Sequence, residues 1–300
     1  MLLKTLISEF EFHCTARELS PKTITGYRKQ TGYLANFLKE KHNISLLEDI
    51  RPSHIKEYLV CMKKLGRKPS YLNDLLKAFK CLFKYAFEEG YTSTLLTERV
   101  SNVQEPKVII HPFAAQEIKN MVSYYGGHTF LEIRNKVMLM LFFDTGIRLS
   151  ELTGMHTWQV KADYFLIQGK GNKERIVPKS ALLGKWLIKY MAIRESYFAY
   201  KAAPDYVFLS KNGQKLTPEA IHKVLTIAGK AVGVNPLVRV SPHTCRHTFA
   251  HMQLKNGLDL YSLSRLMGHE SISITQRYLE GIKNEQVLTA AKKTGVLMNL

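Results

Sequence analysis

The chain has 300 residues, 45% of them hydrophobic, which is enough for one large or two medium globular domains that each bury a core. Its formal net charge of +18 favours a polyanionic partner, with nucleic acid ahead of an anionic membrane surface. No run approaches the roughly 20 apolar residues of a membrane span, and the four scattered cysteines include no C-x-x-C pair, which argues against a membrane protein, a zinc ribbon and a disulfide scaffold.

Residues 1–103 predict an all-helical domain. Ser20 is a suitable N-cap for a helix that has a proline at its first position and apolar residues along one face. A second helix is predicted to start at Ser53, and a third to run over residues 71–87 and to stop at Gly90.

The rest of the chain predicts a linker and a second, mixed domain. NVQEPKVIIHP contains two prolines and no helical period, which indicates an extended linker at residues 104–112 and leaves residues 113–300 as the second domain. There, the apolar run VMLMLFFDTG predicts a central helix that stops at Gly146. DYFLIQGKGNKERIVP has two β-type segments around glycines, which predicts a hairpin, and helical patterns return from Thr217. We therefore expect a mainly α fold with a small antiparallel sheet.

Four short blocks in the second domain carry residues suited to breaking a phosphodiester. Cleavage without a metal requires a nucleophile, cations on the non-bridging oxygens and an acid for the leaving oxygen. The blocks are, in order, TGIRLSEL, QGKGNKER, SPHTCRHT and LMGHESISITQRYLE. In this order and spacing, they make the chain resemble the tyrosine recombinase, or λ-integrase, family in its two-domain Xer-like type. An S-x-x-T-x-x-x-Y run from Ser20 extends the resemblance to that family's SAM-like core-binding domain.

The resemblance implies a set of catalytic residues: Arg148, Lys170, His243, Arg246, His269 and Tyr278. Arg148 and Arg246 would grip the scissile phosphate, because a guanidinium stays protonated and binds oxyanions bidentately. Glu151, three residues after Arg148, would support that arginine. The plainer alternative, a simple helical ion pair between the two, is compatible with this role.

By the same resemblance, Tyr278 is the nucleophile, and its attack would leave a 3'-phosphotyrosine and a free 5' hydroxyl. His269 would hydrogen-bond the phosphate, and His243 would handle the tyrosine proton. The surrounding cations would favour the phenolate. Because the bond energy is retained in the phosphotyrosine, resealing needs no ATP, and the chain has no nucleotide-binding loop. We expect neither a cofactor nor a metal.

Lys170 lies in the predicted hairpin turn, where glycines let the backbone approach DNA closely. The resemblance implies that it protonates the leaving 5' oxygen. Lys173 and Arg175 are nearby cations, and only the match to the family's G-K-G turn separates them from Lys170. We expect these two residues, together with Ser20 and Thr23, to contact DNA.

A metal site is a rival interpretation of the histidines around SPHTCRHT. His243, His247 and His251 recur at a spacing of four and would lie along one face of a helix. No H-E-x-x-H glutamate or carboxylate cluster accompanies them. We therefore expect His247 and His251 to be core residues or to orient their neighbours.

The resemblance also implies the partners of the chain. Double-stranded DNA would be held between the two domains, and four protomers that are monomeric in solution would assemble on two DNA sites. An accessory protein or a second recombinase is compatible with this scheme. Apolar positions in the last 14 residues, from Val287 to Leu300, would either dock on their own domain or pass to a neighbouring subunit. A cytoplasmic, nucleoid-associated enzyme is expected.

The preferred function is that of an integrase, transposase or resolvase of a mobile element. Three alternatives to it remain open. One is an Xer-type recombinase that resolves chromosome or plasmid dimers. In housekeeping Xer proteins the nucleophilic tyrosine is usually the first residue of Tyr-Thr-His, whereas this chain has Leu279 and Glu280 after Tyr278. Another is a type IB topoisomerase, which uses similar chemistry. The last is a DNA-binding regulator that kept the fold without catalysis.

Overall fold

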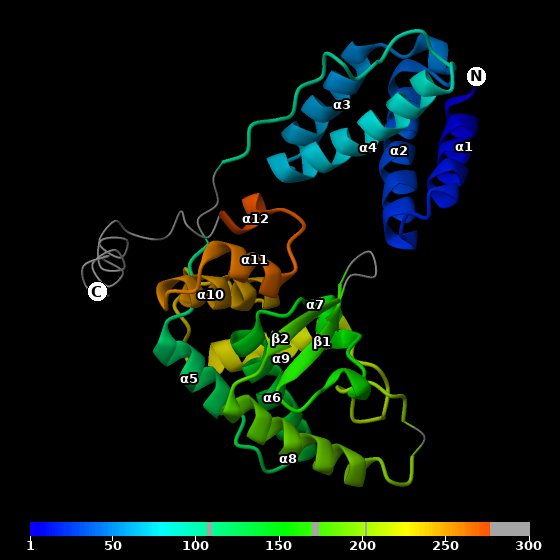
Figure 1. Ribbon diagram of the computed structural model, residues 1–300. Coiled ribbons are helices and arrows are strands. Elements are labelled where there is room, and N and C mark those ends of the chain that lie inside the picture. Colours follow the sequence, from blue (N-terminus) through cyan, green and yellow to red (C-terminus); the bar gives the residue numbers. More distant parts are fainter. Residues whose placement is uncertain (107–109, 170–173, 202, 277–300) are drawn as a thin grey trace, which may run out of the picture. The chain divides into compact units, whose positions relative to one another are not determined.

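The structure is a computed structural model that describes residues 1–106, 110–169, 174–201 and 203–276 (Figure 1). The chain divides into two compact units, Met1–Val108 and Ile109–Leu300, which we call the N-terminal and C-terminal units. Within the described ranges, no helix is both long and apolar enough to cross a membrane.

The N-terminal unit is helical throughout its described part. It contains α1 (Leu3–Ala16), α2 (Pro21–His42), the 3-10 turn η1 (Leu47–Asp49), α3 (Pro52–Lys64) and α4 (Pro69–Glu88). Prolines start α2, α3 and α4, because proline has no N–H to lose at the first helical position and its φ already suits a helix. The helices predicted from Ser20, from Ser53 and over residues 71–87 are confirmed. Leucine and phenylalanine side chains of α1, α2 and α4 form the shared core.

The described part of the C-terminal unit consists mostly of helices around one hairpin. Its elements are α5 (Ala115–Tyr124), α6 (Phe130–Thr145), α7 (Leu149–Thr153), η2 (Thr157–Gln159), β1 (Tyr164–Gln168), β2 (Glu174–Pro178), α8 (Ala181–Tyr197), α9 (Pro218–Ala231), α10 (Pro242–Lys255), α11 (Leu260–Met267) and α12 (Ile272–Gln276). The predicted fold class, mainly α with a small antiparallel sheet, is confirmed.

Helix α6 lies at the centre of this unit. Its apolar side chains are buried on all sides, as VMLMLFFDTG predicts, and it packs against α5, α8 and α10. Thr129 caps its start by accepting from the Glu132 N–H, and Gly146 ends it in the left-handed region at φ +59°. The chain therefore leaves α6 at a defined point and turns directly into α7.

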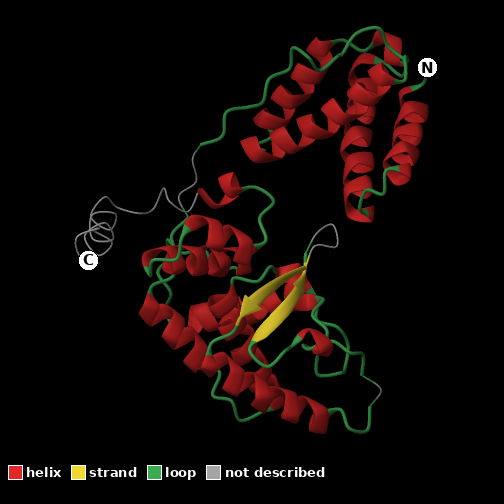
Figure 2. Cartoon of the chain, viewed as in Figure 1, coloured by secondary structure: helices red, strands yellow, loops and turns green. Residues whose placement is uncertain are grey.

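The sheet is the predicted hairpin, shown in yellow in Figure 2. Strands β1 and β2 are antiparallel, and Gln168 pairs with Glu174 at the end next to the turn. Phe165, Ile167 and Val177 point into the core, while Ile176 on the opposite face is exposed. This alternation, expected of a half-buried strand pair, brings the side chain of Arg175 to the same face as its partner Ile167.

Candidate active site

The turn after α6 places Arg148. Gly146 adopts a left-handed conformation, and a Cβ at this position would overlap the ring of Phe249 on α10, so both the backbone angle and the packing require glycine. Arg148 then precedes α7, and its backbone N–H donates to Glu151 Oε2 at 2.8 Å. The Arg148 guanidinium is thereby held at the start of α7, with 36% of its side chain exposed.

Glu151 is the centre of an ion-pair network. Its carboxylate accepts from Arg148 Nη1 at 2.8 Å and from Arg175 Nη1 and Nη2, both at 2.7 Å. The Glu151 side chain is only 5% exposed. Burial raises its pKa, but the hydrogen bonds and charge of Arg175, together with the backbone N–H and guanidinium of Arg148, outweigh that effect and lower it to about 2. Glu151 therefore stays ionised throughout the physiological pH range.

The end of α11 collects three arginines from three distant segments. The carbonyls of residues 266–268 lie at the C-terminal end of this helix, where the last turn leaves acceptors without helical partners. Arg175 Nε donates to the first carbonyl at 2.8 Å, Arg246 Nη2 to the second at 2.6 Å and Arg148 Nη2 to the third at 2.8 Å. The negative end of the helix dipole also favours these cations. One helix end thus orients three guanidinium groups.

Arg246 and His269 form the buried side of the site. Arg246 on α10 is 6% exposed and also donates from Nη1 to the Gly146 carbonyl at 2.6 Å. Its Nη2 lies 3.0 Å from His269 Nε2, and His269 Nδ1 lies 2.7 Å from Thr275 Oγ1. Desolvation and the charges of Arg246, Arg148 and Arg175 lower the pKa of His269 to about 4, so its ring is neutral near pH 7.

His243 lies one helical turn before Arg246 on α10 and is exposed to solvent. Partial desolvation and the charges of Arg246 and Arg239 lower its pKa. A neutral imidazole in this place is able to accept a proton from a nearby hydroxyl.

His247, one turn further along α10 from His243, has a different environment. Burial is the main cause that lowers its pKa to about 4, and electrostatic interactions with His251 and then His243 contribute in the same direction. Across the described ranges, no group of three or more His, Cys, Asp or Glu side chains is arranged to hold a metal ion.

Three predicted site residues, Lys170, Lys173 and Tyr278, lie outside the described residues. The described residues bring together Arg148, Glu151, Arg246 and His269, with His243 on the same helix as Arg246. The sequence did offer a signal for the carbonyls that bind the arginines. The glycines in TGIR and LMGHE are typical of helix ends, where backbone carbonyls lack helical partners. Thr275, the partner of His269, was missed because nothing about a threonine in this segment marks it as buried.

The structure differs from the prediction of a DNA contact for Arg175. Its side chain is 9% exposed, and its Nε, Nη1 and Nη2 all donate within the protein, to the Leu266 carbonyl and to Glu151. The strand carries it inward rather than toward solvent. Ser20 is the N-cap of α2, and its Oγ accepts from the Thr23 N–H at 3.2 Å. The DNA contacts of Ser20 and Thr23 stay predictions.

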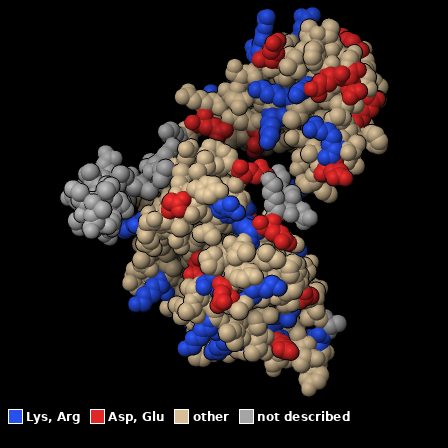
Figure 3. All heavy atoms as spheres, viewed as in Figure 1, with Lys and Arg blue, Asp and Glu red and all other residues tan. Residues whose placement is uncertain are grey.

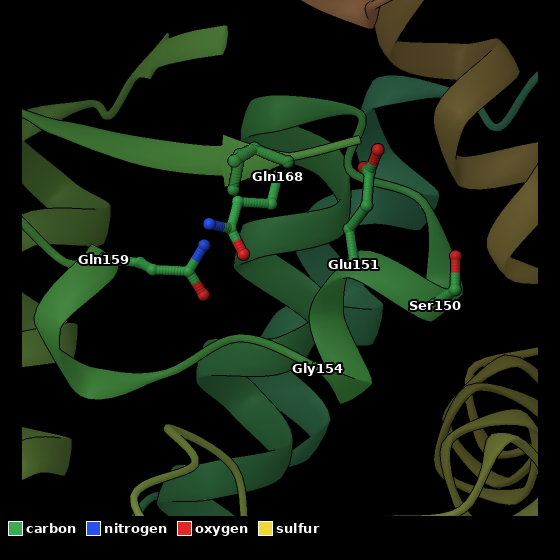
Figure 4. A pocket seen from close by; sticks show the side chains of 6 residues that line it. Ser150, Glu151, Gly154, Gln159 and Gln168 are labelled. Atoms are coloured by element: carbon green, nitrogen blue, oxygen red, sulfur yellow. The ribbon is translucent and has the colours of Figure 1, made fainter. Parts of the chain in front are cut away.

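A small pocket adjoins Glu151 between α7 and the sheet. Its lining residues are Ser150, Glu151, Gly154, Gln159, Ile167 and Gln168. In Figure 4, the amides of Gln159 and Gln168 point toward one another, while Ser150 and Glu151 extend from α7. Gln159 Nε2 donates to the Leu166 carbonyl at 2.8 Å, so this amide braces β1. On the face shown in Figure 3, basic and acidic side chains are interspersed over both units.

Comparison with known proteins covers both units. Residues 7–90 match the N-terminal SAM-like domain of phage integrases, and residues 112–285 match the phage integrase family. Tyrosine recombinase XerD of Oceanobacillus iheyensis is 27% identical over 272 residues, which cover 90% of this chain and 91% of that protein. XerD of Yersinia pestis is 30% identical over 265 residues, or 87% of each chain. A structure of the Tn1549 transposon integrase in complex with circular intermediate DNA has a TM-score of 0.76 at 17% identity, over 96% of this chain and 98% of that one, and this similarity concerns the fold.

Proposed function

This chain belongs to the phage integrase family of tyrosine recombinases, and from this we propose that it cleaves and rejoins DNA at specific sites through a covalent 3'-phosphotyrosyl intermediate. The observation that carries the proposal is the convergence of Arg148, Arg246 and His269 on the end of α11. Arg148 meets Gly268 across 120 residues of sequence, and Arg246 meets Gly146 across 100. Two guanidinium groups and an imidazole in one place form a site for a phosphate.

In this proposal, each residue has one task. Arg148 and Arg246 stabilise the charge that develops on the non-bridging oxygens. The Tyr278 hydroxyl attacks the phosphorus and forms the phosphotyrosine bond, while the bond to the 5' oxygen breaks. Lys170 gives its proton to that oxygen, and His243 accepts the proton of Tyr278. The reverse steps, with a 5' hydroxyl from a partner strand as the nucleophile, reseal the DNA without an external energy source.

We further propose the assembly in which this happens. Double-stranded DNA is the partner, and residues 1–103 serve as the core-binding domain, residues 104–112 as the linker and residues 113–300 as the catalytic domain. Four protomers, monomeric in solution, act on two DNA sites. The enzyme works in the cytoplasm at the nucleoid. The net charge of +18 supports a polyanionic partner.

Two biological roles remain candidates. The curated relatives named above are XerD proteins, which supports a resolution enzyme. The departure after the nucleophile, Leu279-Glu280 in place of Thr-His, supports an integrase of a mobile element. The position of the cleaved DNA site decides between them, since it lies beside the gene in a mobile element and apart from it in a housekeeping system.

Covalent trapping tests the proposed chemistry. The protein would be incubated in EDTA with duplexes that contain a nick and a randomised central segment, and adducts would be purified under denaturing conditions, sequenced and mapped by mass spectrometry. We expect an adduct on Tyr278 that is absent from Tyr278→Phe. An adduct that persists in Tyr278→Phe would overturn the assignment of Tyr278 as the nucleophile. No adduct from a protein that binds DNA tightly would overturn the proposed cleavage and favour a DNA-binding regulator.

A further inference from the structure

We propose that Arg175 is a positioning residue for strand cleavage, which sets the orientation of Arg148 through their shared partner Glu151. This inference rests on the proposed function, and it replaces the DNA contact predicted for Arg175 from the sequence. The two arginines bind the Glu151 carboxylate in different ways.

Arg175 takes the two-pronged position on the carboxylate. Its Nη1 and Nη2 each lie 2.7 Å from a different oxygen of Glu151, the planar fork geometry that a guanidinium and a carboxylate prefer. Arg148 is left with a single side-chain bond to the carboxylate, from Nη1 to Oε1 at 2.8 Å. Because Arg175 occupies the bidentate position, Arg148 reaches Glu151 with only one of its terminal nitrogens.

The second terminal nitrogen of Arg148 is therefore available for the end of α11. Arg148 Nη2 donates to the Gly268 carbonyl at 2.8 Å, next to His269. Without Arg175, the carboxylate would be open to a two-pronged pairing with Arg148. That pairing would turn the guanidinium away from Gly268 and from the place where a phosphate would lie.

Arg175 is itself held tightly enough to serve as a reference point. Its side chain is 9% exposed, and Nε donates to the Leu266 carbonyl at 2.8 Å. Gly268 lies against it, since a Cβ on that glycine would come within 3.0 Å of Arg175 Cδ. The residue thus joins β2 to the helix end that precedes His269, and in the sequence it follows Lys170 by five residues.

The test separates cleavage from binding. Duplexes recovered by the trapping experiment would be used as the substrate, and the rate of adduct formation at saturating protein would be measured beside the DNA affinity. We expect Arg175→Met to slow cleavage by roughly 100-fold, as a small misplacement of a reacting group does, with DNA affinity nearly unchanged. Arg175→Lys restores a charge without the fork, so we expect a partial recovery, and this variant keeps the test usable if Arg175→Met does not fold.

A double-mutant cycle distinguishes positioning from general structural support. If Arg175 acts through Glu151, adding Arg175→Met to Glu151→Gln should change the cleavage rate by less than about threefold. Multiplied effects in the double variant, or an unchanged rate in Arg175→Met, would overturn the proposal. Arg194→Met is the matched control, because Arg194 also donates to backbone carbonyls, of Tyr206 and Pro204, away from the site.

The two proposals fail separately. A wild-type adduct that disappears in Tyr278→Phe establishes strand cleavage whatever the Arg175 variants do. With that adduct in hand, the Arg175 results test only the positioning role.

Discussion

His269 is held at both ring nitrogens, and the identity of its partners determines which nitrogen carries the hydrogen. The Arg246 guanidinium can only donate, so His269 Nε2 accepts from it and Nδ1 carries the hydrogen that faces Thr275. To donate to a phosphate from Nε2, the ring must take the other tautomer. A threonine hydroxyl both donates and accepts, so Thr275 suits either form.

Thr275→Val removes this hydroxyl and keeps the shape of a fully buried side chain. We expect about a tenfold slower adduct formation, because the variant lacks a hydrogen bond worth roughly 1 to 1.5 kcal/mol. Single-turnover trapping measures the rate, and Thr275→Ser should recover most of it. Equal rates for the valine and serine variants would contradict a role for the hydroxyl.

Lys170→Ala tests the assignment of the general acid. We expect strong loss of cleavage on ordinary DNA, in the range of 100-fold to 10,000-fold typical of general acid catalysis. A 5'-bridging phosphorothiolate releases a thiolate that needs no proton, so it should be cleaved at nearly the wild-type rate. Lys173→Ala on both substrates is the control. If Lys170→Ala also fails to cleave the phosphorothiolate DNA, Lys170 is excluded as the acid.

At the scale of elements, the ends of helices decide where the cations lie. Helix α6 ends at Gly146 and α11 ends at Gly268, and both glycines have positive φ. Each presents a carbonyl to an arginine from another segment. The sharp end of a helix thus becomes part of the site, because its unpaired carbonyls accept from guanidinium groups.

Gly146→Ala should destabilise the protein by about 3 kcal/mol, since it combines a left-handed backbone with an overlap on Phe249. It should also slow cleavage, because the Gly146 carbonyl orients Arg246. Gly233→Ala is the control: Gly233 has φ +68° with open space around it, so only the backbone cost of about 1 kcal/mol applies. Denaturant unfolding of the two variants measures the difference, and similar losses would contradict the packing argument.

Helix α10 makes stability depend on pH through His247. Its folded pKa of about 4 lies below the ordinary value of 6.5, so the unfolded chain binds more protons between these limits. The stability that the neutral ring provides is complete above pH 6.5 and is lost as pH falls toward 4, at up to about 1.4 kcal/mol per pH unit. We expect His247→Gln to reduce this slope in unfolding experiments at pH 7, 6 and 5, with His222→Gln on α9 as the control. An unchanged slope would contradict the assignment.

For the whole molecule, the dominant property is the net charge of +18. If DNA is bound by neutralising six or more phosphates, affinity should fall by about 1,000-fold or more between 50 and 200 mM salt. The protein would be titrated into the duplex sequence recovered by the trapping experiment at several salt concentrations, with sucrose added to match osmolality. These titrations measure how steeply affinity falls with salt. A flat dependence would argue against phosphate neutralisation as the source of affinity.

Helices and the hairpin were predictable because their signals are local. Proline at the starts of α2, α3 and α4, glycine at the end of α6 and the alternation around Gly169 act within a few residues. The order of the four blocks was equally visible, and through it the family. Each of these patterns depends on neighbours in the sequence and needs no knowledge of distant contacts.

The role of Arg175 was decided only by the tertiary structure. In the sequence it is one of three cations in QGKGNKER, and a basic residue beside a turn is compatible with a phosphate or a carboxylate partner. Its actual partners, Glu151 and the Leu266 carbonyl, lie 24 and 91 residues away. The sequence by itself therefore determined the elements and the family, whereas packing of β2 against α7 and α11 determined which arginine could face a phosphate, because burial and long-range hydrogen bonds leave no local pattern.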